Sequence, residues 1–310
     1  MKYIVTGGAG FIGSHIVEAI AGSHEVVVID NFSSGKQENL SMFSDNVHRI
    51  PGSITDFPLL KDAFLGADGI FHLGAIASVA RSVDDPIATH ETNLTGTLNV
   101  LLAARDCGVK KVVFSSSSAV YGDEPTLPKR EDMPPVPLSP YAVSKLAGEY
   151  YCKVFFELFG LKTVSLRYFN VFGPRQDPQS EYAAVIPKFI TRLLNHQAPL
   201  IFGDGKQTRD FVYVKDVVQA NLLAMQSTKT GTFNIGSGES IDLNTLARTL
   251  AEIMKVNIPP LYEKPRSGDI RDSVSDITAA KKSLGYGTSY SLDMGLAETI
   301  TWLSSPQTGN

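Results

Sequence analysis

Cysteine is scarce in this chain, which holds two among 310 residues, Cys107 and Cys152. Each stands alone in an apolar helical pattern, without a CxxC pair, and this argues against a disulfide framework and against a cysteine zinc site. The six histidines are scattered, with no pair at ligand spacing along a helix. We therefore predict no metal site, and a reducing cytoplasm as the compartment.

Long apolar runs and an excess of one charge are missing as well. No stretch approaches the roughly 20 apolar residues of a membrane span, and the apolar run at 3–5 ends in glycines, too early for the core of a signal peptide. The net charge is −4, from 28 basic and 32 acidic residues, with no clustered basic face. These absences predict a soluble protein with neither a membrane nor a nucleic acid as partner.

Short apolar runs alternate with helical patterns through the first half of the chain. The runs are rich in β-branched residues and flanked by turn residues, which favours strands. Between them, apolar residues recur at three- and four-residue spacing, which favours helices. We predict strands at 3–6, 25–29, 47–50, 69–73 and 111–115, and helices at 11–21 and 94–107 among others. Strict alternation predicts an α/β fold, a Rossmann-type doubly wound parallel sheet.

The rhythm changes after a further strand expected at 164–167. Prolines at 174, 178, 187 and 199 punctuate the next stretch, which indicates loops with one helix. We predict a smaller C-terminal substrate-binding lobe over the carboxyl edge of the sheet, where ligands of open α/β sheets bind. The expected domains are 1–166 and, mainly, 167–310, with returns to the first domain near 211–236.

A glycine-rich turn, TGGAGFIG, follows the first strand at residues 6–13. Glycines at 7, 10 and 13 permit a tight turn, let backbone N–H groups approach a pyrophosphate and let the helix pack on the strand. The second strand ends in Asp30, whose carboxylate can accept hydrogen bonds from a ribose 2′-OH and would repel the 2′-phosphate of NADP. The pattern predicts NAD binding, and a purely structural turn at either place is the alternative.

Tyr141 and Lys145 stand four residues apart near the start of an expected helix, so both side chains share one face. A serine-rich strand end at 115–118 should finish at the carboxyl edge of the sheet. A base for a substrate hydroxyl must ionise near neutral pH, whereas the tyrosine pKa is about 10. A nearby ammonium and a positive nicotinamide favour phenolate, and a pKa about three units lower corresponds to roughly 4 kcal/mol. We predict Tyr141 as the base with Ser117 on the same oxygen; a core tyrosine and a surface lysine are the alternative.

A series of motifs extends along nearly the whole chain. In order they are TGGAGFIG at 6–13, Asp30-Asn31, ETNLTGTLNV at 91–100, SSSSAVYG at 115–122, YAVSK at 141–145, RYFNVFGPRQDP at 167–178, YAAVIPKF at 182–189, GDGKQTRDFVYVKD at 203–216 and RSGDIRDS at 266–273. In these motifs the chain resembles the extended short-chain dehydrogenase/reductase family. Within that family it is most similar to the UDP-glucose and UDP-N-acetylglucosamine 4-epimerases.

The resemblance implies which residues form the site. It places NAD on Gly7, Gly10, Phe11, Ile12, Gly13, Asp30, Asn31, Ser53, Ile54, Asn93, Tyr141, Lys145 and Tyr168. Acid/base catalysis falls to Ser117 and Tyr141, supported by Lys145. The UDP-hexose is expected on Ser78, Ser117, Ser118, Asn170, Val185, Arg209, Arg266, Asp269 and Ser273. The two arginines would bind phosphate through charge-assisted bonds and Asp269 the ribose; the alternative for the arginines is a solvated surface charge.

Three departures from the family pattern bear on specificity. Ser53 stands where the family often has an aspartate that contacts adenine, so Ser53 is assigned to NAD by its position alone, without that carboxylate contact. Ala77 replaces a lysine that glucose-type epimerases usually carry, and its surroundings look more like the N-acetylhexosamine branch. Aligned through GDIRDS, Ser273 stands where some members have a gating tyrosine. A small side chain there leaves room for an acetamido group, or has no steric role, and the sequence leaves both open.

The implied function is 4-epimerisation of UDP-glucose and UDP-galactose, and of their N-acetylated forms, through a transient 4-keto sugar. Tyr141 would take the proton of the C4 hydroxyl while a hydride passes to tightly bound NAD and later returns to the opposite face. A dehydratase or decarboxylase on this fold would need acidic residues where Ser118 and Ala119 stand. A non-catalytic NAD-binding regulator would tolerate the loss of Ser117, Tyr141 and Lys145, which are all present.

Two expected helices carry more apolar residues than one core-facing stripe needs. Segment 146–159 includes Tyr150, Tyr151, Val154, Phe155, Phe156 and Phe159. Surplus apolar faces indicate an interface, and relatives pair two such helices from each subunit. We therefore predict a homodimer formed through helices near 94–107 and 146–159.

Overall fold

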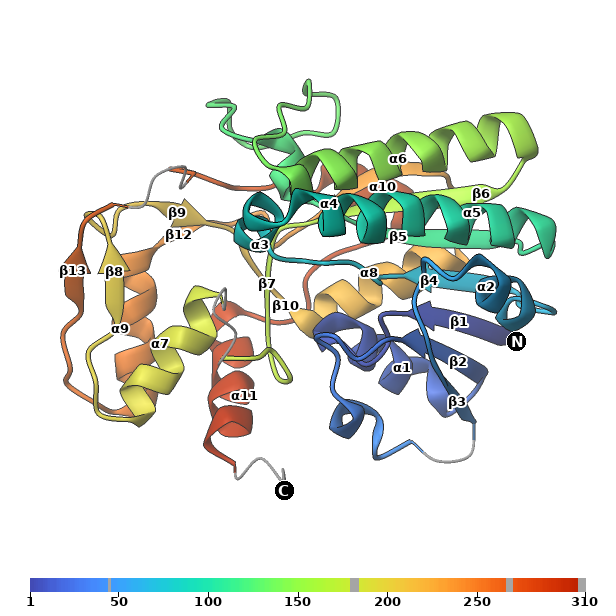
Figure 1. The fold of residues 1–310 in the computed structure, drawn as a ribbon. Coiled ribbons are helices and arrows are strands. Elements are labelled where there is room, and N and C mark those ends of the chain that lie inside the picture. Colours follow the sequence, from blue (N-terminus) through green and yellow to red (C-terminus); the bar gives the residue numbers. More distant parts are fainter. Residues whose placement is uncertain (44–45, 179–183, 266–269, 306–310) are drawn as a thin grey trace.

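Seven parallel strands form one sheet in the computed structural model, which describes residues 1–43, 46–178, 184–265 and 270–305 (Figure 1). Their order across the sheet is β11-β6-β5-β4-β1-β2-β3. The strands are β1 (Lys2–Thr6), β2 (Glu25–Asp30), β3 (Val47–Pro51), β4 (Gly69–His72), β5 (Lys111–Ser117), β6 (Lys162–Tyr168) and β11 (Gly231–Ile235). The chain order reverses between β1 and β4, as in a doubly wound sheet. The predicted α/β, Rossmann-type fold is confirmed.

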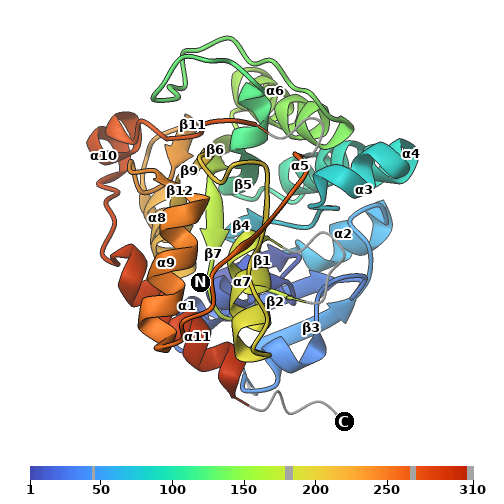
Figure 2. The same cartoon turned by 90° about the vertical axis from the view of Figure 1, so that its left-hand side faces the viewer.

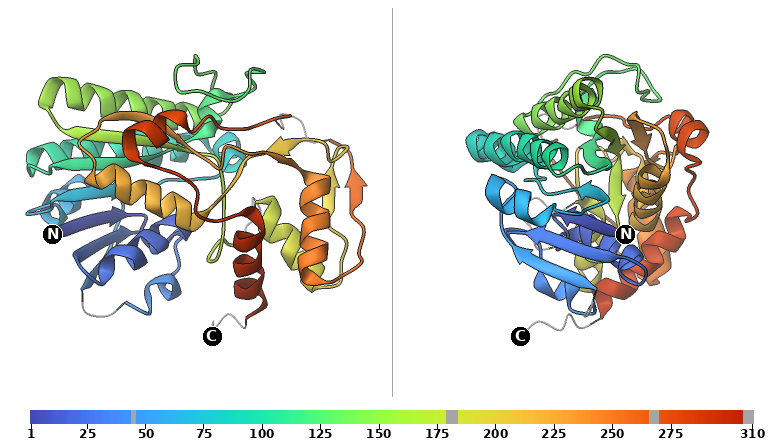
Figure 3. Two further views of the ribbon diagram at one scale, coloured as in Figure 1. Left: turned by 180° about the vertical axis from the view of Figure 1, so that it is seen from behind. Right: turned by 90° about the vertical axis from the view of Figure 1, so that its right-hand side faces the viewer.

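Helices cover both faces of this sheet, because successive side chains of a strand point to opposite faces. In β1, Val5 packs into the core under one helix layer, whereas Ile4 packs into the core under the other. One layer contains α1 (Phe11–Ala21) and α8 (Val214–Gln226), and the other contains α2 (Phe57–Ala63), α5 (Gly96–Asp106) and α6 (Pro140–Phe159). The right-hand view of Figure 3 shows α5 and α6 on one side of the sheet and α8 on the other.

The element bounds expected from the sequence hold with one clear exception. The helix at 11–21 coincides with α1, and the strands agree to within two residues at each end. The helix expected at 94–107 instead continues from α4 (Pro86–Thr89) through a π-helical turn, η2 (His90–Thr95), into α5. Asp85 caps this run and Pro86 occupies its first position, which is a helix start signal. The run was missed because residues 89–93, THETN, are polar and break the apolar periodicity.

Three pairs of short strands lie outside the large sheet. They are β7 (Asn170–Phe172) with β10 (Phe211–Tyr213), β8 (Leu200–Phe202) with β13 (Leu261–Glu263), and β9 (Thr208–Arg209) with β12 (Ile241–Asp242). The region near 211–236 was expected to return to the first domain. Within it, β11 pairs with β6 of the large sheet and α8 packs on that sheet, whereas β10 pairs with β7 outside it.

Several segments from the second half of the chain form a lobe beside the carboxyl edge of the sheet, seen face-on in Figure 2. Its helices α7 (Val185–Leu194), α9 (Leu243–Met254) and α11 (Leu292–Ser304) share a separate hydrophobic core with β7 and β10. The shorter elements are η1 (Gln37–Leu40), α3 (Val79–Asp84), η3 (Ser118–Tyr121) and α10 (Thr278–Leu284). Among the described residues, no helix has the length and apolar character to cross a membrane.

Candidate active site

The glycine turn between β1 and α1 leaves a cradle that only glycine permits. Gly7 has a φ of +70°, and a Cβ on Gly13 would lie 2.1 Å from the Gly7 carbonyl oxygen. Gly10 caps α1 but has no side chain to bond the first N–H groups of the helix. Those N–H groups and the positive end of the helix dipole therefore face outward for an anion. The predicted residues Phe11, Ile12 and Gly13 supply these groups, so the cradle fits a pyrophosphate.

Asp30 joins the end of β2 to this cradle. Its carboxylate accepts hydrogen bonds from the backbone N–H of Ala9 at 2.9 Å and of Phe32 at 2.8 Å. These two bonds fix the carboxylate at the carboxyl edge of the sheet and leave further lone pairs for a ribose hydroxyl. The side-chain Oδ1 of the neighbouring Asn31 accepts from Ser33 N–H at 3.1 Å.

Ser53 and Ile54 lie after β3, on the adenine side of the expected site. The hydroxyl of Ser53 is paired with that of Thr55 at 2.8 Å. The side chain of Ile54 is buried in the core beneath α5. A cofactor contact at Ile54 would therefore fall to its backbone.

Asn93 uses both protons of its carboxamide within the protein. They bond the Ile76 carbonyl at 3.0 Å and Ser144 Oγ at 3.1 Å, and the amide oxygen accepts from Ile76 N–H at 2.7 Å. A contact from Asn93 to the cofactor is thus limited to the second lone pair of that oxygen. The residue fastens the segment after β4 to α6.

Tyr141, Lys145 and Ser117 come together at the carboxyl edge of the sheet. Tyr141 is the second residue of α6, and Lys145 follows one helical turn later. The Lys145 Nζ donates to the Ser115 carbonyl at 2.8 Å and lies 5.8 Å from the centre of the Tyr141 ring. Ser117 ends β5, and its side chain lies near enough to the Tyr141 phenol to act on its pKa. The structure thus assembles the three residues that the sequence singled out.

Burial governs the ionisation of this trio. It raises the pKa of Tyr141 above 10, although the hydrogen bond with Ser117 acts in the opposite direction. It also lowers the pKa of Lys145 to about 8. The sequence predicted a lowered tyrosine pKa from Lys145 and a nicotinamide together. In the protein alone the phenol shifts the other way, because a buried anion is poorly solvated.

Tyr168, at the end of β6, is the remaining predicted cofactor contact. Its ring is buried in the core, and its hydroxyl donates to Asn221 Oδ1 at 2.9 Å. Burial raises its pKa well above 10. This phenol is therefore anchored rather than poised for proton transfer.

The predicted substrate residues that the structure describes come from several elements of the sheet region and of the lobe. Asn170 donates from both its backbone N–H and its side chain to the Asp210 carbonyl, and Val185 begins α7. Ser273 lies beside β9, and its backbone N–H donates to the Thr208 carbonyl at 3.2 Å. Ser118 begins η3, and Ser78 caps α3 by accepting from Arg81 N–H. Arg266 and Asp269 lie outside the described residues.

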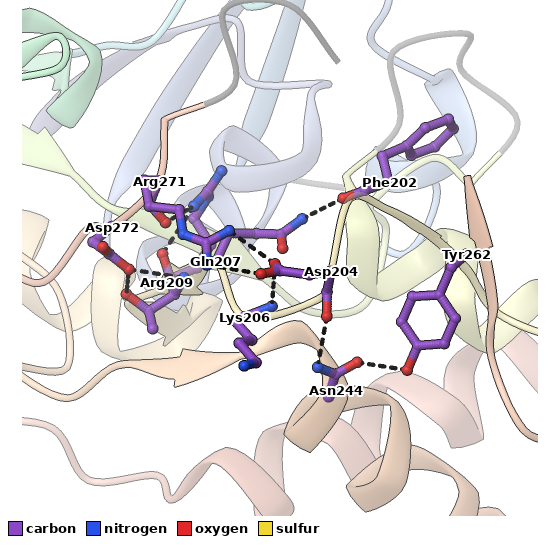
Figure 4. A network of polar contacts seen from close by, with 10 residues as sticks. Phe202, Asp204, Lys206, Gln207, Arg209, Asn244, Tyr262, Arg271 and Asp272 are labelled. Atoms are coloured by element: carbon purple, nitrogen blue, oxygen red, sulfur yellow. Dashed lines mark hydrogen bonds and ion pairs between the residues drawn. The ribbon is translucent and has the colours of Figure 1, made fainter. Parts of the chain in front are cut away.

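Arg209 borders a network of polar contacts in the lobe (Figure 4). Its Nη1 donates to the Thr208 carbonyl at 2.9 Å and to the Arg271 carbonyl at 3.3 Å. The guanidinium of Arg271 pairs with Asp204 at 2.8 Å and holds the pKa of that carboxyl well below its usual range. Arg209 is therefore held by backbone carbonyls at the edge of the lobe rather than standing as an isolated surface charge.

A cavity of about 510 Å³ opens beside this network. It is lined by Phe202, Gly203, Asp204, Gln207, Glu263, Pro265, Ile270 and Arg271. Gln207 donates from Nε2 to the Phe202 carbonyl at 2.7 Å, and its buried Oε1 has no partner among the described residues. An aromatic wall beside an unused amide oxygen suits a planar polar ring. Within the motif GDGKQTRDFVYVKD at 203–216, only Arg209 was expected to bind substrate, and Asp204 and Gln207 were missed.

Comparisons with known proteins agree over nearly the full chain. The NAD dependent epimerase/dehydratase family matches residues 3–236. A UDP-glucose 4-epimerase of Mycolicibacterium smegmatis is 42% identical, with 97% of each chain covered. A UDP-N-acetylglucosamine 4-epimerase of Methanobrevibacter ruminantium, solved with UDP-N-acetylmuramic acid, is 43% identical at a TM-score of 0.95, over 97% of both chains. A UDP-glucose 4-epimerase of Thermus thermophilus, solved with NAD, is 39% identical at a TM-score of 0.90, over 98% of this chain and 99% of that one.

Proposed function

Because the chain belongs to the NAD dependent epimerase/dehydratase family, we propose that it is a UDP-hexose 4-epimerase that uses NAD. The observation that carries this proposal is the assembly of Ser117, Tyr141 and Lys145 at the same carboxyl edge of the sheet as the glycine cradle. The three similar proteins described above are all UDP-sugar 4-epimerases. The similarity spans both the sheet and the lobe, so it includes the residues expected for substrate as well as those for cofactor.

The cofactor would lie across the carboxyl edge of the sheet. The backbone N–H groups at the start of α1 would hold its pyrophosphate and Asp30 its adenosine ribose. A carboxylate at position 30 favours NAD over NADP, since it repels a 2′-phosphate. Bound NAD supplies a hydride acceptor that can also return the hydride.

Tyr141 would act as the base that starts the reaction. Its phenolate removes the proton from the C4 hydroxyl, the C4–H bond breaks with loss of a hydride, and a C4 carbonyl forms. In the reverse sense the phenol returns the proton once the hydride has come back to the other face of the keto sugar. Ser117 holds the same oxygens by hydrogen bonding, and Lys145 contributes positive charge beside the phenol.

The phenolate needs help that the protein alone does not give. Burial raises the pKa of Tyr141 in the chain without ligand, so the base would ionise only when positive charge arrives beside it. The nicotinamide ring of the oxidised cofactor carries such a charge. We therefore expect Tyr141 to become an effective base in the complex with NAD, and not before.

The nucleotide would anchor the substrate in the lobe. We propose that uracil occupies the cavity lined by Phe202 and Gln207, and that Arg209 and Arg266 bind the diphosphate, with Asp269 on the ribose. Binding energy placed on this constant part allows the keto sugar to turn over while the nucleotide stays bound. The domains 1–166 and 167–310 would accordingly divide cofactor from substrate, with α8 and β11 returned to the first.

Both plain and N-acetylated hexoses are proposed as substrates. Ser273 is small and lies beside Thr208 near the nucleotide cavity, where a larger side chain would narrow the space for an acetamido group. Ala77 likewise stands where glucose-type epimerases usually carry a lysine, which favours acceptance of N-acetylated hexoses. The two similar structures include one of each type at comparable identity.

The proposal also extends to assembly and compartment. Exposed apolar side chains on α6 include Tyr150, Val154, Leu158 and Phe159, and we propose that they join helices near 94–107 and 146–159 of two subunits in a homodimer. Cys107 and Cys152 are unpaired, as expected for the cytoplasm that we propose.

Product analysis tests the function. The purified protein, supplied with NAD, is incubated with UDP-galactose and separately with UDP-N-acetylgalactosamine, and the nucleotide sugars are separated. We expect the corresponding gluco epimers from both. A 4-keto-6-deoxy product would identify a dehydratase, and carbon dioxide released in a parallel incubation with UDP-glucuronic acid would identify a decarboxylase. NAD binding without any turnover would identify a non-catalytic protein.

A further inference from the structure

Two serine hydroxyls hold the backbone of Tyr141 from opposite sides. The N–H of Tyr141 donates to Ser82 Oγ at 3.1 Å, and its carbonyl accepts from Ser144 Oγ at 2.7 Å. Ser82 is 0% exposed and Ser144 is 4% exposed. The peptide groups on both sides of the Tyr141 Cα are therefore fixed in a place that water does not reach.

The first of these bonds comes from outside the helix. Tyr141 is the second residue of α6, so its N–H has no carbonyl partner within the helix. The N-cap residue Ser139 satisfies the next N–H, that of Ala142, at 3.1 Å. Ser82 supplies the missing acceptor for Tyr141 itself, from the separate helix α3.

The hydroxyl of Ser82 is itself fixed in direction. It donates to the Val79 carbonyl at 2.6 Å, so its lone pairs point toward Tyr141. Ser82 lies on α3, whose N-cap is Ser78, one of the residues expected to face the sugar. The bond between Ser82 and Tyr141 thus links the substrate-facing segment to the catalytic helix.

Asn93 makes a second link between the same two parts. It donates to Ser144 Oγ and also binds both the N–H and the carbonyl of Ile76. Ile76 stands two residues before Ser78. Segment 76–82 is consequently fastened to the first turn of α6 at both of its ends.

We propose that Ser82 and Ser144 are positioning residues, which set the phenol of Tyr141 relative to the sugar by pinning its backbone to segment 76–82. This inference rests on the proposed epimerase function. Neither serine is expected to touch the substrate or the cofactor, and both act through Tyr141. A general base must lie within hydrogen-bond reach of the proton that it removes, and a displacement of about 1 Å can slow a reaction roughly a hundredfold.

The consequence should appear in kcat and not in nucleotide binding. UDP would be anchored in the lobe, away from Ser82 and Ser144, so loosening Tyr141 leaves that anchor intact. The loosened phenol would also sit less well beside its positive neighbours, and the pH at which kcat reaches half its maximum should rise. A role limited to stability would move neither quantity.

The experiment compares Ser82→Ala, Ser144→Ala and a control, Ser291→Ala, in the full-length protein with NAD. Ser291 caps α11 by accepting from Met294 N–H, so its loss removes a serine cap from a helix of the lobe that does not carry Tyr141. With UDP-galactose as substrate, kcat of Ser82→Ala and of Ser144→Ala should each fall about tenfold. KM and the affinity for UDP should change by less than about twofold, and Ser291→Ala should match the wild type.

The double variant gives the sharpest comparison. Both serines constrain the same backbone, so the loss in Ser82→Ala/Ser144→Ala should fall well short of the product of the two single losses. Amide hydrogen exchange at Tyr141 should accelerate in Ser82→Ala and not in Ser291→Ala. If Ser82→Ala does not fold, Ser144→Ala decides the matter, because it removes the side-chain bond to the Tyr141 carbonyl and the link from there to Asn93.

The outcomes separate this inference from the function beneath it. A wild-type protein that does not epimerise UDP-galactose would overturn both. An active wild type whose folded Ser82→Ala or Ser144→Ala variant keeps kcat within twofold, with an unchanged pH profile, would overturn the positioning role alone. A raised KM at unchanged kcat would also overturn it, since it would place these serines in substrate binding.

Discussion

A buried ion pair beneath the active site should dominate the stability of this region. Arg167 on β6 binds Glu149 on α6 through two parallel bonds, of 2.9 Å from Nε and 2.7 Å from Nη2. Ser116 Oγ donates to the same carboxylate at 2.5 Å, and the guanidinium lies 4.8 Å from the Tyr121 ring. Pairing with Glu149 outweighs the effect of burial and raises the pKa of Arg167, so the arginine keeps its charge under all ordinary conditions.

The perturbation is Glu149→Gln, which removes the negative charge and leaves the arginine buried. Both side chains are about 5% exposed, so water cannot replace the lost partner. Breaking one half of a buried pair costs about 3–5 kcal/mol. For 310 residues the unfolding entropy is roughly 0.65 kcal/mol/K, so the midpoint of thermal unfolding should fall by about 5–8 °C.

The control is Glu157→Gln on the same helix. Glu157 pairs with Lys153 at 3.8 Å, but these side chains are 56% and 71% exposed, and such a surface pair contributes at most about 1 kcal/mol. Both variants are measured by thermal unfolding and by urea titration at one pH. Equal losses in the two variants would refute the assignment of stability to the buried pair.

Three further predictions concern pH, assembly and specificity. Burial lowers the pKa of His72 to about 3, so below about pH 6.5 the unfolded chain binds a proton that the folded protein does not bind. Urea unfolding should therefore show that about 2 kcal/mol of stability is lost between pH 8 and 5. His72→Asn should lack this loss, and an equal loss in both proteins would contradict the prediction. Light scattering at micromolar concentration should give a dimer that Leu158→Arg, on the exposed face of α6, converts to monomer; a monomeric wild type would refute the interface. Ser273→Tyr should lower kcat/KM for UDP-N-acetylgalactosamine at least tenfold, about 1.4 kcal/mol, relative to UDP-galactose, and an unchanged ratio would show that residue 273 does not gate the pocket.

Local signals in the sequence were enough for the fold and for the cofactor loop. Runs of β-branched residues predicted the strands of the first half, because these strands are buried on both faces. Apolar spacing of three and four residues predicted α1, because one face of this helix packs on the sheet. The glycine turn is equally local, since the requirement at Gly7 and Gly13 arises from backbone within a few residues. The motif around Tyr141 and Lys145 depends on a single helical turn.

Contacts across long separations could not be read in the same way. Ser82 meets Tyr141 across 59 positions and Arg167 meets Glu149 across 18. These pairings depend on the order of strands in the sheet and on how α3 packs against α6. The spacing of residues along the sequence indicates neither. Ser144 lay within a motif already singled out, yet its role became visible only from its two partners.

The ionisation of Tyr141 illustrates the same limit. The sequence shows a lysine one turn away, which suggests a lowered pKa, but it does not show that the side chain of Tyr141 is buried. Burial reverses the direction of the shift in the ligand-free protein. The chemistry therefore depends on the positive charge that arrives with the cofactor. From the sequence, this charge was expected to share the effect with Lys145.

The most direct test of the account is the turnover of Tyr141→Phe with UDP-galactose and NAD. The variant keeps the ring in its buried position and removes only the hydroxyl. We predict that kcat falls by about 10²–10⁴-fold while UDP binds with unchanged affinity. Epimerisation by Tyr141→Phe at a rate within a few-fold of the wild type would contradict the central claim that this phenol moves the proton.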